Sequence, residues 1–262
     1  MKTQVSWGIL VFLAAGVMGV CAQAPPAKTP SPQAPAAQSP LEKAKAAYEQ
    51  RADPAEAKAA MQLFAEAAKA DPKSYEAFWQ GAQSCYFYGE YTRAKASDDE
   101  KMAIFQDGID RAKAAVALNP KGVEGHFWLG VLYGVYGQAK GIFKSLSLVP
   151  NIKQEMKTCQ ELDPSVDGYG PDRVLGRMYY KLPWFKGGDN KKSIRYLEAS
   201  LKGAPTNALT RLYLAEVYKA EGMKEKAIEQ VKAIIGMTPD PRWNAEYPSI
   251  KAKAEKLLQK WS

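Results

Sequence analysis

The amino-acid sequence predicts an all-α protein built from paired helices. Apolar residues recur with a period near 3.6 along most of the 262-residue chain, and few segments alternate with the period of two that marks a strand. Proline, which cannot continue a helix, recurs at Pro72, Pro120, Pro164, Pro205 and Pro239. These prolines lie 48, 44, 41 and 34 residues apart, so we expect a series of repeats whose lengths differ.

The last interval equals the period of the tetratricopeptide repeat, in which small residues let two helices approach and large residues fill the spaces between pairs. The second-helix pattern of that repeat is matched by Ala60, Phe64, Ala67 and Pro72. The first-helix pattern is matched at three places, Leu129-Gly130-Tyr133, Leu175-Gly176-Tyr179 and Leu214-Ala215-Tyr218. We therefore expect a tetratricopeptide-like helical-repeat superhelix.

Five helix pairs are expected in chain order, each ending just before one of the prolines, and a C-terminal helix should cap the last pair. The pairs span residues 41–71, 74–118, 123–162, 171–203 and 206–237, and the capping helix spans residues 246–260. Compared with a plain repeat, the chain carries insertions at residues 91–101, 138–151 and 181–189. Asp189 is the expected N-cap of the helix over residues 190–202. Such insertions often extend the binding side of a solenoid.

The N-terminal part of the chain predicts export. Residues 1–22 combine Lys2, an apolar run and a small-residue cleavage site, as a signal peptide does. Residues 23–40 are rich in proline and alanine and predict a disordered linker, so the helical-repeat domain occupies residues 41–262. We expect a periplasmic protein. The alternative is a lipoprotein anchored through Cys21, which Val20 fits poorly, and only that form would contact a membrane.

Composition excludes several kinds of function. The net charge is +8, but lysines are mixed with glutamates along the helix faces, and export argues against nucleic acid as a partner. The single histidine, His126, leaves no zinc site or histidine-based triad, so we expect it to be structural. Cys85 and Cys159 fall at apolar positions and are expected to be buried free thiols, with a disulfide as the alternative. We predict no enzyme activity, no metal and no cofactor.

Glycines follow one face of the helix expected over residues 125–141, at Gly130, Gly134, Gly137 and Gly141. Each interior glycine costs a helix about 1 kcal/mol relative to alanine, so the stripe needs a reason. The favoured interpretation is a packing seam, since Gly130 is already the small position of the repeat. The alternative is a cavity or channel for a small apolar ligand, lined by Trp128, Tyr136 and Phe143.

One motif goes beyond the tetratricopeptide pattern. The sequence GPDRVLG at residues 170–176 is followed by Tyr179-x3-Pro183 and by Gly188-Asp189. With these residues and GHFWLGVLYGVYGQAKG at residues 125–141, the chain resembles the TRAP transporter T-component family (TatT-like) over residues 100–240. The resemblance implies an exported, non-enzymatic helical-repeat protein that works with a periplasmic solute-binding subunit. The alternative function is a general tetratricopeptide scaffold for cell-envelope assembly.

Further candidate partner-binding residues lie in and after this motif. Asp172 and Arg173 serve either as a helix cap and a local ion pair or as contacts to a partner on the concave surface. Tyr179 belongs to the same motif. Trp184 and Phe185 form either an exposed binding loop or a plug folded back on the solenoid. The identities of ligand and partner stay open, as does assembly into a homo-oligomer.

Overall fold

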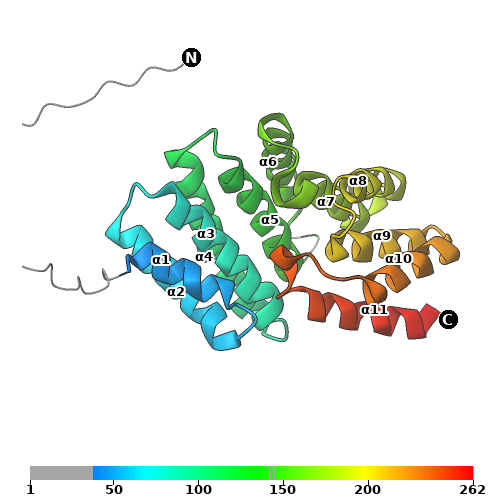
Figure 1. The fold of residues 1–262 in the computed structure, drawn as a ribbon. Coiled ribbons are helices and arrows are strands. Elements are labelled where there is room, and N and C mark those ends of the chain that lie inside the picture. The colour runs from blue at the N-terminus through cyan, green and yellow to red at the C-terminus, as the bar shows by residue number, and fades with distance from the viewer. Residues whose placement is uncertain (1–37, 142, 144, 262) are drawn as a thin grey trace, which may run out of the picture. The chain divides into compact units, whose positions relative to one another are not determined.

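Eleven α-helices, and no strand, make up the part of the chain described by the computed structural model, which is residues 38–141, 143 and 145–261 (Figure 1). The expected signal peptide, Cys21 and most of the expected linker lie outside the described residues. No helix among the described residues has the length and apolarity needed to cross a bilayer.

The expected helix pairs are confirmed. Each helix packs against the next one along the chain. The five pairs are α1 (Pro40–Glu49) with α2 (Pro54–Ala70), α3 (Tyr75–Phe87) with α4 (Asp98–Leu118), α5 (Val123–Lys140) with α6 (Val149–Leu162), α7 (Val166–Lys181) with α8 (Asn190–Gly203), and α9 (Ala208–Ala220) with α10 (Lys224–Gly236). The final helix α11 (Tyr247–Trp261) packs on α10 and α9, as a capping helix should.

Short polar side chains fix where several of these helices begin. Each accepts a hydrogen bond from a backbone N–H of the first turn, at Ser39, Asp53, Ser74, Ser97, Asp189 and Asn207. The N-cap predicted at Asp189 is therefore confirmed. Because these N–H groups lack partners inside the helix, the caps account for element boundaries that local sequence can predict.

The insertions form the connections between helices. A π-helix, η1 (Tyr88–Thr92), follows α3, and the 3-10 helices η2 (Leu146–Leu148) and η3 (Trp184–Lys186) lie in the second and third insertions. Gly141 and Gly187 have φ values of 93° and 91° at the turns that precede η2 and follow η3. Most other residues are strained in that region, so glycine is what allows the chain to turn there.

The core follows the large–small code of the repeat. The aromatic rings of Phe64, Phe105 and Phe127 are fully buried, and Ala60, Ala82 and Ala112 supply the small positions between helices. Cys85 and Cys159 are buried free thiols, which confirms the expectation and excludes a disulfide between them.

The first helix pair contacts the segment before the last helix. The guanidinium of Arg51, just after α1, binds the Glu246 carboxylate (Nε–Oε1 3.3 Å) and donates from Nη2 to the Arg242 carbonyl at 2.8 Å. Arg242 belongs to a third 3-10 segment, η4 (Pro241–Trp243), which returns toward the first helices before α11 begins (Figure 1). The two ends of the repeat are thus joined by a nearly buried ion pair.

Candidate functional site

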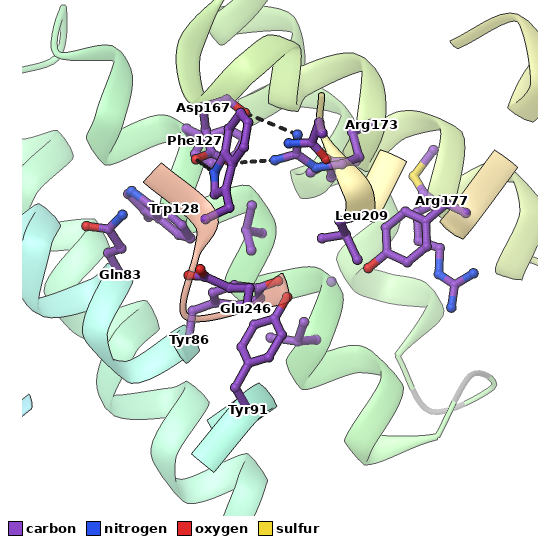
Figure 2. A pocket seen from close by; sticks show the side chains of 18 of the residues that line it. Gln83, Tyr86, Tyr91, Phe127, Trp128, Asp167, Arg173, Arg177, Leu209 and Glu246 are labelled. Atoms are coloured by element: carbon purple, nitrogen blue, oxygen red, sulfur yellow. Dashed lines mark hydrogen bonds and ion pairs between the residues drawn. The ribbon is translucent and has the colours of Figure 1, made fainter. Parts of the chain in front are cut away.

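A partly open cavity of about 400 Å³ lies among helices drawn from most of the repeat. Its walls come from α1, α3, α5, α6, α7, α9 and α11, together with η1, η2 and η4. Figure 2 shows labelled side chains from α3, η1, α5, α7 and α9, together with Glu246, around one space. This volume suits a small molecule and lies within the usual range of ligand pockets.

One wall of the cavity is aromatic. The ring of Tyr86 lies 5.4 Å from that of Trp128, which in turn lies 5.1 Å from that of Phe127. Tyr91 packs edge-on against Tyr86 at 6.1 Å. Burial raises the pKa values of Tyr86 and Tyr91 above the usual range, so both hydroxyls stay protonated and this wall carries no charge. Tyr213 of α9 adds a further ring.

Four arginines also line the cavity, and each guanidinium has its own carboxylate. The pairs are Arg51 with Glu246, Arg173 with Asp167, Arg177 with Glu216 and Arg242 with Asp240. The guanidinium of Arg177 also stacks on the Tyr213 ring at 4.1 Å. Lys181 lines the cavity too, but its side chain is exposed to solvent. The interior of the cavity is therefore close to charge balance.

The motif around Arg173 holds this side chain in place. Asp167, Gly168 and Tyr169 adopt left-handed φ values of 50°, 64° and 56° inside α7. This turn directs the Asp167 carboxylate and carbonyl at Arg173, and the other oxygen of the same carboxylate accepts from Trp243 Nε1 at 3.4 Å. A Cβ on Gly170 would lie 2.3 Å from the buried Phe127 ring, so glycine is required there. The distinctive motif thus shapes the cavity wall.

The glycine stripe of α5 has three different roles. A Cβ on Gly130 would lie 2.4 Å from Met156 Cε, and one on Gly137 would lie 3.1 Å from Ser145 Cβ, so these two glycines permit close packing. A Cβ on Gly134 would meet nothing within 4 Å, and Gly134 lines the cavity. Gly141 ends the helix. The favoured packing-seam interpretation is correct for Gly130, correct for Gly137 although this glycine also lines the cavity, and wrong for Gly134 and Gly141.

Of the candidate residues predicted from the sequence, the structure brings Trp128 and Arg173 together in the cavity. Tyr136 and Tyr179 do not line it. Tyr136 packs at the edge of the core with Lys140 Nζ 5.6 Å from its ring, and Tyr179 stacks on Tyr196 at 5.7 Å. A cavity lined by Tyr136 and Phe143 is therefore not what the structure shows.

Asp172 does not cap a helix. Its Oδ1 accepts a hydrogen bond from Gln160 Nε2 of α6 at 2.6 Å, and partial burial raises its pKa. The expected local ion pair of Arg173 is present, although its partner is Asp167. Asp172 therefore links α6 to α7, on a side of the helix away from the cavity lining.

The remaining three candidates lie together on the surface. Phe143, Trp184 and Phe185 have exposed fractions of 65%, 85% and 55%. The Phe143 ring lies 6.5 Å from that of Phe185, which meets Trp184 edge-on at 5.7 Å. We call these three side chains the aromatic patch. Trp184 and Phe185 are not a plug folded back on the solenoid.

Several cavity residues could not be found from the sequence. Arg177 and Tyr213 lie in ordinary helical patterns, and Arg51 and Glu246 lie in turns between helices. They are brought together by contacts between segments up to 195 residues apart. Asp167 and Arg177 stand close to either end of the recognised motif at residues 170–176, but the motif does not indicate that they line a cavity.

The remaining reactive side chains are accounted for by structural contacts. His126 Nδ1 lies 2.6 Å from Glu155 Oε2, and its Nε2 lies 3.0 Å from the Pro120 carbonyl oxygen. Burial raises the pKa values of the Cys85 and Cys159 thiols to about 12, so neither is a thiolate at neutral pH. Within the described ranges no three histidine, cysteine or acidic side chains are grouped to hold a metal ion.

Comparisons with solved structures agree on the fold. TTC0263, a tetratricopeptide-repeat protein of Thermus thermophilus, is 20% identical with a TM-score of 0.60, over 83% of this chain and 97% of its own. The human IFIT1 dimer bound to PPP-AAAA is 16% identical with a TM-score of 0.53, over 86% of this chain and 49% of its own. At these identities the likeness concerns the fold alone. No curated protein matches the chain.

Two family patterns divide the described part of the chain between them. A tetratricopeptide-repeat pattern matches residues 185–260. The pattern of the family described as "Regulator of microtubule dynamics protein 1-3" matches residues 40–181, which is more than half of the chain and includes α1 to α7. The chain is a tetratricopeptide-like helical-repeat protein and belongs to the regulator of microtubule dynamics protein 1–3 family.

Proposed function

We propose that this chain is a non-enzymatic binding protein whose cavity takes a small, largely apolar ligand without net charge. The observation that carries the proposal is that the cavity combines an aromatic wall with arginines whose charges are balanced by carboxylates. Rings of Tyr86, Trp128 and Tyr213 offer apolar surface, while each lining guanidinium already has a carboxylate. A charged ligand would have to leave water for a site whose guanidinium groups already hold carboxylates, whereas an apolar one gains from every ring it covers.

The same site offers little to catalysis. The buried thiols are protonated, the imidazole of His126 is occupied by Glu155 and lies outside the cavity lining, and the arginines hold their carboxylates in ion pairs. Catalysis needs a nucleophile beside a base, or an acid and a base with separated pKa values, facing the substrate. The paired groups suit recognition better than turnover.

Titration with the uncharged fluorescent probe N-phenyl-1-naphthylamine tests the ligand proposal. Gly134→Leu should fill open space in the cavity and weaken probe binding about tenfold or more, equivalent to ~1.4 kcal/mol. Gly236→Leu is the matched control, because a Cβ at Gly236 also meets nothing within 4 Å but this residue does not line the cavity. Equal affinity of the native protein and Gly134→Leu would contradict the proposal.

The proposed protein partner is the periplasmic solute-binding subunit of a TRAP-type transporter. The support is the resemblance at residues 170–176, which include Arg173 and Val174 of the cavity lining. This proposal requires export, so cell fractionation should find the chain in the periplasm, or in the membrane if Cys21 carries a lipid. Purified solute-binding subunit from the same organism should bind the chain in solution. A cytoplasmic chain, or absence of binding, would contradict it.

A general scaffold for cell-envelope assembly is the second candidate function. The tetratricopeptide-like fold favours it, since such solenoids present extended surfaces to other proteins. The two candidates differ in what pull-downs from envelope fractions recover. A scaffold should capture envelope-assembly proteins with or without a TRAP transporter in the cell, whereas a transporter component should capture its solute-binding subunit.

A further inference from the structure

The aromatic patch belongs neither to the core nor to the cavity. Among the described residues six large apolar side chains are exposed, and three of them, Phe143, Trp184 and Phe185, are gathered here. They lie on two connections, between α5 and α6 and between α7 and α8, each of which turns at a glycine with positive φ. A Cβ at either glycine, Gly141 or Gly187, would meet nothing within 4 Å. The rings therefore stand at the tips of two turns, where Trp184 also lines an open hollow beside Asp189 and Asn190.

The two connections that carry these rings are rich in lysine. Residues 138–148 and 181–192, which form the two connections, contain six lysines, one acidic residue and no arginine. Within these two ranges, the lysines that the structure describes are Lys140, Lys181, Lys186, Lys191 and Lys192, and all five are exposed. Lys186 Nζ lies 6.0 Å from the Phe185 ring. The acidic groups beside Trp184 are engaged, since Asp189 caps α8 and pairs with Lys192 while Glu221 accepts from Asn190. The patch therefore carries a local positive charge.

We propose that the aromatic patch docks onto the surface of a membrane that contains anionic lipids. Tryptophan and phenylalanine rings partition into the boundary between headgroups and acyl chains, and lysine side chains reach from there to lipid phosphates. Three rings at the tips of turns, with lysines behind them, present both contributions to a flat surface. Docking needs neither a spanning helix nor a lipid on Cys21.

Other occupants fit the patch less well. Protein interfaces are enriched in arginine and depleted in lysine, the reverse of this composition. A second copy would bring two lysine-rich surfaces together. Residues 1–40 of this chain contain Lys2 and Lys28 but no acidic residue, so this segment has no charge complementary to the patch. An anionic lipid surface is the occupant that satisfies the rings and the lysines together.

Vesicle flotation of the full chain tests the proposal. The native chain should float with vesicles in which about a third of the lipid is phosphatidylglycerol, and more weakly with phosphatidylcholine alone. Trp184→Ser with Phe185→Ser should lower the partition coefficient about tenfold or more. Leu118→Ser with Met223→Ser is the matched control, since both side chains are exposed, at 40% and 39%, outside the patch. Lys186→Glu should weaken binding to the anionic vesicles about fivefold or more.

All these variants keep the same N-terminal residues, so binding through that segment would survive in the Trp184/Phe185 variant and would contradict the proposal. Quenching by lipids brominated in the acyl chains locates the contact directly. Native fluorescence should be quenched, and Trp184→Phe should still float while losing that quenching. Quenching that persists in Trp184→Phe overturns the proposal. The proposal is also overturned if the Trp184/Phe185 substitutions leave flotation unchanged but abolish self-association of the native chain or its capture of the solute-binding subunit.

Discussion

At the scale of single residues, the role of each glycine depends on the atoms that would surround a side chain at its position. Gly134 and Gly170 both lie in helical segments, yet the first faces open space and the second faces the Phe127 ring. Sequence showed the spacing of the stripe but not what lay against each member. That distinction depends on where α6, α7 and the cavity lie relative to α5, which no local pattern specifies.

Two substitutions should therefore shift stability in opposite directions. Gly134→Ala should raise the free energy of unfolding by about 1 kcal/mol, because alanine is the better helix former and its Cβ has room. Gly170→Ala should lower it by roughly 1–3 kcal/mol through overpacking against Phe127, which is fully buried. Urea denaturation of both variants measures the difference. A loss of stability in Gly134→Ala would mean that the space beside it is filled.

The two buried thiols make a second prediction at this scale. Because burial raises the pKa values of Cys85 and Cys159 to about 12, both should resist alkylation in the native protein at about pH 8.5, where an unfolded cysteine is half ionised. The unfolded chain loses these protons first, so stability should fall as the pH rises above that value. Peptide mass spectrometry after timed alkylation checks the first point, with urea-unfolded protein as the control. Rapid native labelling of either cysteine would contradict the burial.

At the scale of elements, the sequence predicted the fold closely because the residues that begin and end a helix lie close to its boundaries in the sequence. Capping side chains, prolines and apolar periodicity lie within a few residues of each boundary, and five helix pairs with a capping helix followed from them. The break inside α7 was not foreseen. At this break Asp167 and Tyr169 adopt left-handed backbone conformations, and Asp167 accepts hydrogen bonds from Arg173 and Trp243.

Asn207 gives a test of capping. Its Oδ1 accepts from the Thr210 N–H at 2.9 Å and from the Thr210 hydroxyl at 3.1 Å, in a buried position at the start of α9. Asn207→Ala should destabilise the protein by about 1–2 kcal/mol, whereas Asn207→Ser should retain most of the stability because serine also caps. Thermal or urea unfolding compares the two. Equal losses would show that the cost comes from packing rather than from the cap.

At the scale of the whole described unit, the contact between the turn after α1 and the segment before α11 completes one wall of the cavity. Arg51 and Glu246 are separated by 195 residues and have side-chain exposures of 9% and 12%. Candidate site residues on a single stretch, such as Arg173 and Trp184, were visible in the sequence. The cavity wall that is assembled from both ends of the repeat could not be predicted, because no local pattern at either end indicates which distant segment it contacts.

Breaking this pair should therefore be costly. Arg51→Met leaves the Glu246 carboxylate buried without its partner and should lower the free energy of unfolding by about 3–5 kcal/mol. Replacing both, as Arg51→Met with Glu246→Leu, should recover much of that loss, because no buried charge is left unpaired. A double-mutant cycle in urea measures the coupling. Additive single effects would contradict a closing contact between the two residues.

The central claim is that the interior of the repeat is a binding site for an uncharged apolar molecule. Its most direct test is a crystal structure of the chain grown with N-phenyl-1-naphthylamine. The account predicts density for the probe in the cavity, beside Gly134 and Trp128 and within reach of Tyr213. A probe bound only at the aromatic patch, or a cavity filled by side chains with no room beside Gly134, would contradict it.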